Sequence, residues 1–392
     1  MTVDEIAAAT GGVPICYLIN APWGGYVFTV DLDHAGKTRV HSTEVSSISS
    51  MTILETTLID METKSPGLLL AQKSSDKSLL PAALQRLSRL QPLIDPVRNS
   101  LLESPNSRVV VVPTGELGLI PLHAIPVGGD RILDDLGEVY LTPSAAVYGA
   151  CRARAQKLVP THLVALADTD PERPLPGSRI EISVISQIFA NSGSRFVTAA
   201  GSEPDLSWLN RYSRSASHLH FACHGEADLS DPLGGCLQLG NGDSLTLNGL
   251  ADGSLENCRL VVASACKSGH YSPGEAPEEF LGLPAGFLQA GAACAVATLW
   301  PISDHATAAL MTRFYELLEV GQGVKERDPV WALREARRWF RNITIAELEA
   351  ISKRNLNLNL DPILSASREE AGNILKLWRT PKYWAAFVAY GY

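Results

Sequence analysis

The stretch LVVASACKSG, residues 260–269, starts as a continuous apolar run and ends in small and polar residues. The earlier stretch HLHFACHG, residues 218–225, has the same character and ends in His-Gly. Apolar runs of this length predict strands that are buried on both faces, which is typical of parallel sheets. We therefore place both runs inside the sheet of an α/β protein.

Further apolar runs lie on either side of these two, at residues 108–113, 162–167 and 293–299. Helical patterns separate them, near residues 178–190, 203–212, 279–290 and 304–320, and two more follow near 328–341 and 345–353. Strands that alternate with helices predict an α/β fold with a mainly parallel sheet flanked by helices on both faces. A final apolar run at residues 384–390 predicts an edge or closing strand.

The N-terminal part has a different pattern. Residues 13–33 predict a β-hairpin around the turn PWGG at 22–25. Within residues 52–102 apolar residues recur at helical spacing, and Pro92 and Pro96 interrupt that pattern, so we expect two helices or one kinked helix. The predicted organisation is an N-terminal hairpin and helical segment, residues 1–103, packed on a core domain of residues 104–392.

The composition narrows the class of protein. Hydrophobic residues make up 45% and charged residues 19% of the chain, as in a soluble globular protein, and the net charge of −9 argues against a nucleic-acid partner. We find neither an apolar stretch long enough to cross a membrane nor a signal peptide. The seven cysteines are scattered and odd in number, which indicates reduced thiols and a cytoplasmic location.

The candidate catalytic residues lie at the ends of the two predicted strands described first, 218–223 and 260–264. Reactive groups of a parallel sheet gather at the carboxyl ends of its strands, where His224 and Cys266 lie. A neighbouring imidazole can take the proton of a thiol and later pass it to a leaving amine. The backbone N–H groups of Gly225 and Cys266 can then form an oxyanion hole.

Each of these residues alone has a structural explanation. A lone cysteine at a strand end is usually a small buried hydrophobe, and a lone histidine in an apolar run is usually a core residue. Their joint position at two strand ends favours a Cys–His dyad, whereas Cys223, His218 and His220 are expected to be structural. No Cys-x-x-Cys pair and no Gly-x-Ser-x-Gly elbow occurs, so we expect no metal, no cofactor and no Ser–His–Asp triad.

Several motifs of this sequence resemble those of a known protein family. The elements His224-Gly225 and Ser264–Gly269 resemble those of the CHAT family, caspase-like domains that are related to separases and are often attached to tetratricopeptide repeats. The resemblance extends from about residue 13 to the end of the chain. It also rests on the stretches VPTG at 112–115, IPL at 120–122, LPGSRIE at 175–181, DPL at 231–233, LWPISD at 299–304, FY at 314–315 and YWAAF at 383–387.

The resemblance implies roles for individual residues. His224 would be the base and Cys266 the nucleophile. In separases an aspartate after a Leu-Trp segment lines the S1 pocket and binds arginine, and Asp304 stands at the similar place. Asp304 equally fits the N-terminal cap of the helix that is predicted to begin there.

Other polar residues near the predicted dyad have less defined roles. Asp231, together with Glu226 and Asp228, would form an acidic rim that favours a basic peptide or simply a solvated loop. Ser264 would touch the substrate or pack in the protein interior.

These observations predict a cysteine endopeptidase that cleaves a specific protein after Arg or Lys. By resemblance its setting would be bacterial defence, stress signalling or regulated cell death. No tetratricopeptide repeats precede the domain, so a separate recruiting or activating protein is one expectation and a longer chain is another. The polar loop Glu319–Asp328 is a candidate site for self-cleavage or activation. The alternatives are a catalytically silent CHAT-fold scaffold that acts by protein assembly and a thiol hydrolase of small amides.

Overall fold

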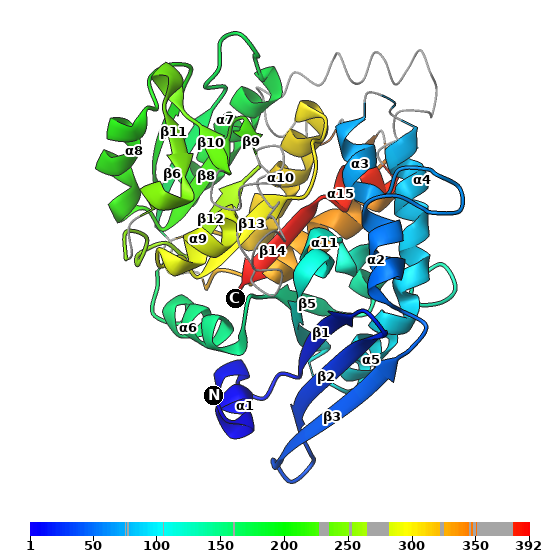
Figure 1. Ribbon diagram of the computed structural model, residues 1–392. Coiled ribbons are helices and arrows are strands. Elements are labelled where there is room, and N and C mark those ends of the chain that lie inside the picture. Colours follow the sequence, from blue (N-terminus) through cyan, green and yellow to red (C-terminus); the bar gives the residue numbers. More distant parts are fainter. Residues whose placement is uncertain are drawn as a thin grey trace.

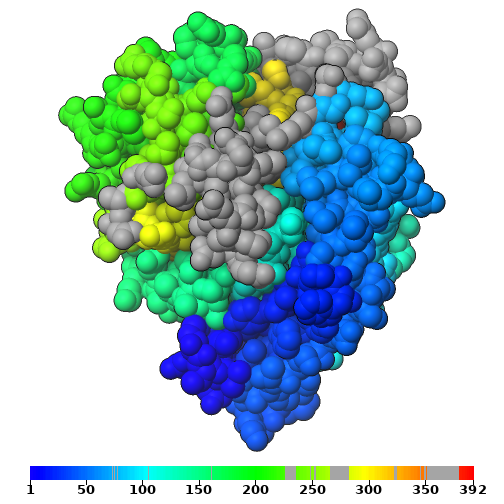
Figure 2. Space-filling view, in the orientation of Figure 1, coloured from blue at the N-terminus to red at the C-terminus, as the bar shows by residue number. Residues whose placement is uncertain are grey.

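The computed structural model describes residues 1–74, 76, 78–104, 106–159, 161–226, 235–250, 253–264, 282–321, 325–344, 346–347, 350 and 379–392. Within these residues eleven strands form one sheet in the order β3-β2-β1-β4-β5-β14-β13-β12-β8-β6-β7 (Figure 1). A small second sheet has the order β11-β10-β9. The N-terminal hairpin and the region around β6 to β11 lie at opposite ends of the molecule (Figure 2).

The half of the large sheet that carries the decisive stretches is parallel, as predicted. Its strands are β6 (His162–Ala167), β7 (Arg195–Ala200), β8 (His218–Ala222), β12 (Leu260–Ala263) and β13 (Cys294–Thr298). Strand β12 pairs in parallel with β8 on one side and with β13 on the other. All residues of β6, β8, β12 and β13 are buried, which explains their continuous apolar sequences.

The N-terminal half begins with the predicted hairpin. Strands β1 (Ile15–Ala21) and β2 (Gly24–Leu32) are antiparallel, and β1 joins the sheet through a parallel pairing with β4 (Arg108–Pro113). A third strand, β3 (Thr38–Val45), extends the hairpin at the edge of the sheet. The sequence does not predict β3, because residues 39–44 are exposed and show no apolar alternation.

The final apolar run was predicted to be an edge or a closing strand, and the edge position is wrong. Strand β14 (Phe387–Gly391) lies in the interior of the sheet, antiparallel to β13 and parallel to β5 (Glu138–Leu141). It therefore joins the N-terminal half of the sheet to the half that contains β8 and β12. All five of its residues are buried, which accounts for its apolar composition equally well.

Helices cover both faces of the sheet, as predicted. On β8 the side chain of His220 contacts Glu181 of α7 (Pro176–Asn191) and Tyr315 of α10 (Asp304–Leu318). The next residue, Phe221, stacks on Phe287 of α9 (Leu283–Gln289). Because successive strand residues point to opposite faces, α7 and α10 lie on one face and α9 lies on the other.

The remaining elements connect and extend these layers. They are α1 (Val3–Thr10), α6 (Ala145–Ala155), α8 (Leu206–Tyr212), α11 (Pro329–Asn342) and α15 (Pro381–Trp384), with β9 (Gly225–Glu226), β10 (Cys236–Gln238) and β11 (Ser244–Thr246) in the small sheet.

The segment between β3 and β4 is helical, but it is divided more than expected. It contains α2 (Ser50–Thr57), α3 (Leu68–Lys73), α4 (Leu79–Gln85), a 3₁₀ turn (Arg86–Leu90) and α5 (Gln91–Glu103). Pro92 lies in the first turn of α5, where a proline costs no hydrogen bond, and Pro96 lies inside that helix. The apolar stripe of this segment is core, as its spacing predicts, since Leu87, Ile94 and Val97 are buried.

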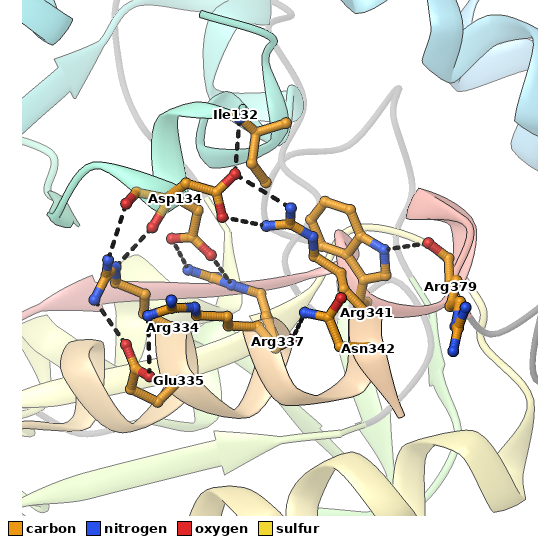
Figure 3. A network of polar contacts seen from close by, with 11 residues as sticks. Ile132, Asp134, Arg334, Glu335, Arg337, Arg341, Asn342 and Arg379 are labelled. Carbon is orange, nitrogen blue, oxygen red and sulfur yellow. Dashed lines mark hydrogen bonds and ion pairs between the residues drawn. The ribbon is translucent and has the colours of Figure 1, made fainter. Parts of the chain in front are cut away.

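Helix α11 is tied to the segment before β5 by a row of arginines (Figure 3). Arg337 donates two hydrogen bonds to Asp134, of 2.9 and 2.7 Å, and a third of 2.9 Å to the carbonyl of Phe387 in β14. Arg341 pairs with Asp135 at 2.6 Å. The network links α11 to β14 and to the loop before β5, across long sequence separations.

Candidate active site

The strands β8 and β12, which lead to His224 and Cys266, are direct neighbours in the sheet. Their parallel register pairs Phe221 with Ala263, and His224 lies as many residues beyond Phe221 as Cys266 lies beyond Ala263. The two strands that precede the predicted dyad thus end side by side at the same edge of the sheet. Cys266 itself lies outside the described residues.

The imidazole of His224 is partly exposed at this edge, and one of its nitrogens has a backbone partner. Nε2 lies 2.7 Å from the carbonyl oxygen of Arg173. A carbonyl oxygen only accepts hydrogen bonds, so Nε2 carries a hydrogen and donates it. In the neutral imidazole Nδ1 is then the unprotonated nitrogen, and it is the atom that can act as a base.

The backbone of His224 is held by the small second sheet. The N–H of Gln238 in β10 donates to the carbonyl of His224 at 2.9 Å, and Gly225 in β9 pairs with Leu237. Gly225, one of the two predicted oxyanion-hole residues, therefore starts a paired strand directly after the histidine. The oxyanion-hole role of Gly225 stays a prediction. It needs a second donor, the N–H of Cys266, and Cys266 lies outside the described residues.

Ser264 lies at the end of β12, beside β8. Its N–H and its hydroxyl both donate to the carbonyl of Phe221, at 3.0 and 3.3 Å. The residue thus ties together the ends of the two strands that lead to the predicted dyad. Its predicted contact with a substrate remains a prediction.

Asp304 is the first residue of α10, as its position after LWPIS suggested, but its carboxylate contacts a different helix. Oδ2 accepts a hydrogen bond of 2.5 Å from the N–H of Gly177, in the first turn of α7. Burial raises the pKa of Asp304 above its usual value, and the hydrogen bond from Gly177 opposes that rise. The capping role predicted for α10 is therefore exerted on α7.

Two further predictions fall wholly or partly outside the described residues. Asp231 and Asp228 are not described, and of Glu226 only the backbone is. The loop Glu319–Asp328 is described except for residues 322–324. Its two ends are joined by an ion pair of 3.0 Å between Arg327 and Glu319.

The loop Glu319–Asp328 lines a cavity of about 730 Å³, which Arg108 and Arg259 also line. Arg259 directly precedes β12, and Tyr392, which also lines the cavity, follows Gly391, the partner of Cys294 at the start of β13. This part of the cavity therefore lies at the amino ends of β12 and β13, on the edge of the sheet opposite His224. A second cavity of about 470 Å³ lies beside the candidate site. Its walls include Arg173 and Gln238, the two residues whose backbones contact His224.

The contact of the Arg173 carbonyl with His224 was not predicted, and no side-chain pattern in the sequence identifies it. Every residue has a carbonyl group, so the selection of this one depends on the path of the loop between β6 and α7. The predicted structural residues are confirmed: Cys223, His218 and His220 are buried. His218 and His220 also face Glu326 and Glu181, at 3.4 and 2.8 Å.

Among the described residues no helix is long and apolar enough to cross a membrane.

Comparisons with known proteins agree with this architecture. Among curated proteins, no sequence matches the chain. Among solved structures, the Saccharomyces cerevisiae separase–securin complex at 2.6 Å resolution matches with a TM-score of 0.59 and 11% identity, over 99% of this chain and 31% of the separase chain. A second separase–securin structure, at 3.0 Å, matches with a TM-score of 0.57 and 11% identity, over 98% of this chain and 30% of the other.

The chain therefore spans about a third of the separase that it matches, and the likeness concerns the fold. A family model of the CHAT domain matches residues 81–392, which is most of the chain. The strand order, the neighbouring ends of β8 and β12, and this match lead to one conclusion. The chain belongs to the CHAT family and has the fold of the caspase-like cysteine peptidases.

Proposed function

We propose that this protein is a cysteine endopeptidase in which Cys266 is the nucleophile and His224 the base. The observation that carries the proposal is the contact of His224 Nε2 with the carbonyl of Arg173. It leaves Nδ1 as the basic nitrogen on a histidine whose strand lies beside the strand that leads to a cysteine. If the Arg173 carbonyl bonded Nδ1 instead, the unprotonated nitrogen would be Nε2.

The reaction would proceed through an acyl-enzyme. His224 Nδ1 takes the proton of the Cys266 thiol, and the thiolate attacks the carbonyl carbon of the peptide bond. The N–H groups of Gly225 and Cys266 donate to the oxyanion, and the imidazolium returns the proton to the leaving amine as the C–N bond breaks. Water, deprotonated by His224, then hydrolyses the thioester and releases the acid product.

The substrate would be a protein, cleaved after Arg or Lys, and Asp304 would supply the negative charge for a basic P1 side chain. The separase of the comparison was crystallised with securin, a protein partner. We infer a protein partner here too, either a substrate or an activating or recruiting protein of the tetratricopeptide type. By family resemblance the setting would be bacterial defence, stress signalling or regulated cell death, and the scattered, odd-numbered cysteines favour the cytoplasm.

The test is cleavage of a mixed peptide library by the wild type, by Cys266→Ala and by His224→Ala. Cuts after Arg or Lys that vanish in both variants support the proposal. Cuts after other residues would retain the peptidase and overturn the basic P1 preference.

The same three proteins are treated with iodoacetamide, and the labelled cysteines are identified by mass spectrometry. An activated thiol at Cys266 that depends on His224, without library cleavage, indicates a specific substrate or an activator. If the library is not cut and Cys266 reacts no faster than a free thiol, the domain is a silent scaffold.

A further inference from the structure

The loop between β6 and α7 brings the carbonyl of Arg173 to His224, and one buried carboxylate closes this loop. Asp168 directly follows β6 and is 8% exposed. Its Oδ1 accepts a hydrogen bond of 2.6 Å from the N–H of Leu175, and its Oδ2 accepts one of 2.5 Å from Nε of Arg179. Asp168 thereby fixes both the end of the loop and the first turns of α7.

The backbone of Asp168 supports this arrangement. Its φ is +50°, in the left-handed region, and its N–H donates to the carbonyl of Ala222, the last residue of β8. Aspartate and asparagine tolerate this conformation better than most other residues, whereas alanine is strained there. The loop therefore begins with a turn that depends on the residue type at position 168 and that is bonded to the strand leading to His224.

Gln238 holds the same loop from the other side. Its side-chain Oε1 accepts a hydrogen bond of 2.5 Å from the guanidinium of Arg173, and its carbonyl accepts one of 2.8 Å from the hydroxyl of Thr169. Its N–H donates to the carbonyl of His224. Gln238 is thus bonded both to the histidine and to the residue whose carbonyl receives the histidine's Nε2 hydrogen.

We propose that Asp168 and Gln238 are positioning residues, which together hold the Arg173 carbonyl against His224 and so keep the imidazole in its base-competent tautomer. This inference rests on the proposed function, because it assigns a role in activating Cys266. Asp168 closes the loop that carries the carbonyl, and Gln238 fixes the distance between that loop and the histidine backbone. Neither residue touches the reacting atoms.

The physical effect concerns the charge on the imidazole. A carbonyl that accepts from Nε2–H stabilises the imidazolium more than the neutral ring, because the bond is then charge-assisted. It therefore favours the thiolate–imidazolium pair over the neutral thiol and imidazole. Misplacement of a catalytic group by about 1 Å can cost about a hundredfold in rate.

The variants separate this role from general stability. Asp168→Asn keeps an oxygen for the N–H of Leu175 and tolerates the left-handed backbone, whereas Asp168→Ala loses both contacts and is strained. Gln238→Glu keeps an acceptor for Arg173, and Gln238→Leu removes it. Asp33→Asn is the control. Asp33 also accepts two hydrogen bonds, both from backbone N–H groups, those of Ala35 and Lys37, but it lies in the β2–β3 turn, away from His224.

The experiment measures the rate of Cys266 alkylation by iodoacetamide between pH 5 and 9, together with thermal melting, on the full chain. We expect Asp168→Ala and Gln238→Leu to react with iodoacetamide about tenfold or more slowly at pH 7. The pH midpoint of their alkylation should move toward that of a free thiol, about 8.5. The alkylation rate of Asp168→Asn should lie between those of Asp168→Ala and the wild type. Gln238→Glu and Asp33→Asn should have the rate and the pH midpoint of the wild type.

A folded Gln238→Leu or Asp168→Asn variant with the rate and pH midpoint of the wild type would overturn the proposal, even if Asp168→Ala failed to fold. His224→Ala distinguishes a failure of the Cys–His dyad from a failure of the positioning role. If it slows alkylation while the loop variants do not, the dyad stands and the positioning role is wrong. If it has no effect, the dyad is wrong and the positioning role falls with it.

Discussion

Asp304 Oδ2 accepts a 2.5 Å hydrogen bond from the N–H of Gly177, and this contact joins the first turns of α10 and α7. A Cβ atom at position 177 would lie 2.7 Å from Cγ of Asp304, so only glycine permits the approach. Helix N-termini carry unpaired N–H groups and a positive partial charge, and the carboxylate satisfies both. The contact fixes the start of α7, just after the loop that presents Arg173.

Substitution of Asp304 separates its helix-capping role from its proposed role in P1 binding. Asp304→Ala removes the cap of α7 and should lower the free energy of unfolding by about 1 kcal/mol, as for other N-terminal caps. Asp304→Asn keeps an acceptor oxygen and should recover most of that stability. If Asp304 also binds the P1 side chain, both variants lose the preference for Arg and Lys in a peptide library, and retained preference in both would show that Asp304 only caps.

The Asp134–Arg337 pair should contribute strongly to stability. Both side chains are almost completely buried and are joined by two hydrogen bonds. Removal of one partner leaves a buried charge without compensation, so Asp134→Ala should cost about 3–5 kcal/mol in urea unfolding. The pair of Arg39 and Asp31 is the comparison, because the Arg39 side chain is exposed, and Asp31→Ala should cost at most about 1 kcal/mol. Equal losses in the two variants would contradict this distinction.

Four of the described cysteines should resist alkylation in the folded protein. Burial raises the pKa of Cys151 to about 11 and that of Cys258 to about 12, and it also raises the pKa values of Cys16 and Cys294. A higher thiol pKa means less thiolate at neutral pH, and the thiolate is the reactive form. Iodoacetamide at pH 7.5 should therefore leave these four unlabelled, and labelling in urea should reach all of them. Fast native labelling of any of the four would contradict its burial.

Asp60 should make stability depend on pH in the acid range. Its carboxylate accepts hydrogen bonds of 2.8 Å from the N–H of Thr63 and 2.7 Å from Arg89, and these hold the pKa of Asp60 well below its usual value. The folded pKa is lower than the unfolded one, so the stabilisation is present above about pH 4 and is lost as the pH falls toward the folded value.

The variant Asp60→Asn lacks this titrating group. Its stability should be below that of the wild type at pH 7, and the difference should shrink between pH 5 and pH 3 in urea unfolding. A difference that stays constant over this range would show that Asp60 acts only through packing.

Much of the fold could be predicted because buried positions are mostly occupied by apolar residues. The runs 218–223 and 260–264 lie in a sheet covered on both faces, so most of their positions are apolar. The hairpin was predictable because its turn residues interrupt alternating strands. Strand β3 was not, because an exposed edge strand needs no apolar pattern.

The position of β14 within the sheet could not be predicted from the sequence, for a different reason. Its apolar sequence predicts a buried strand, and it is buried, but strand order within a sheet depends on which backbones pair. Backbone hydrogen bonds are the same for every residue type, so the insertion of β14 between β5 and β13 leaves no local signal.

By itself, the sequence determined that the chain forms buried parallel strands and that two of them lead to His224 and Cys266, because side-chain polarity reports burial residue by residue. The tertiary structure alone decided that the carbonyl of Arg173 meets His224 Nε2 and that Asp304 caps α7. Both contacts join a side chain to a backbone group that lies far away along the chain. Backbone groups are identical at every position, so only the folded path of the chain selects which of them a side chain reaches.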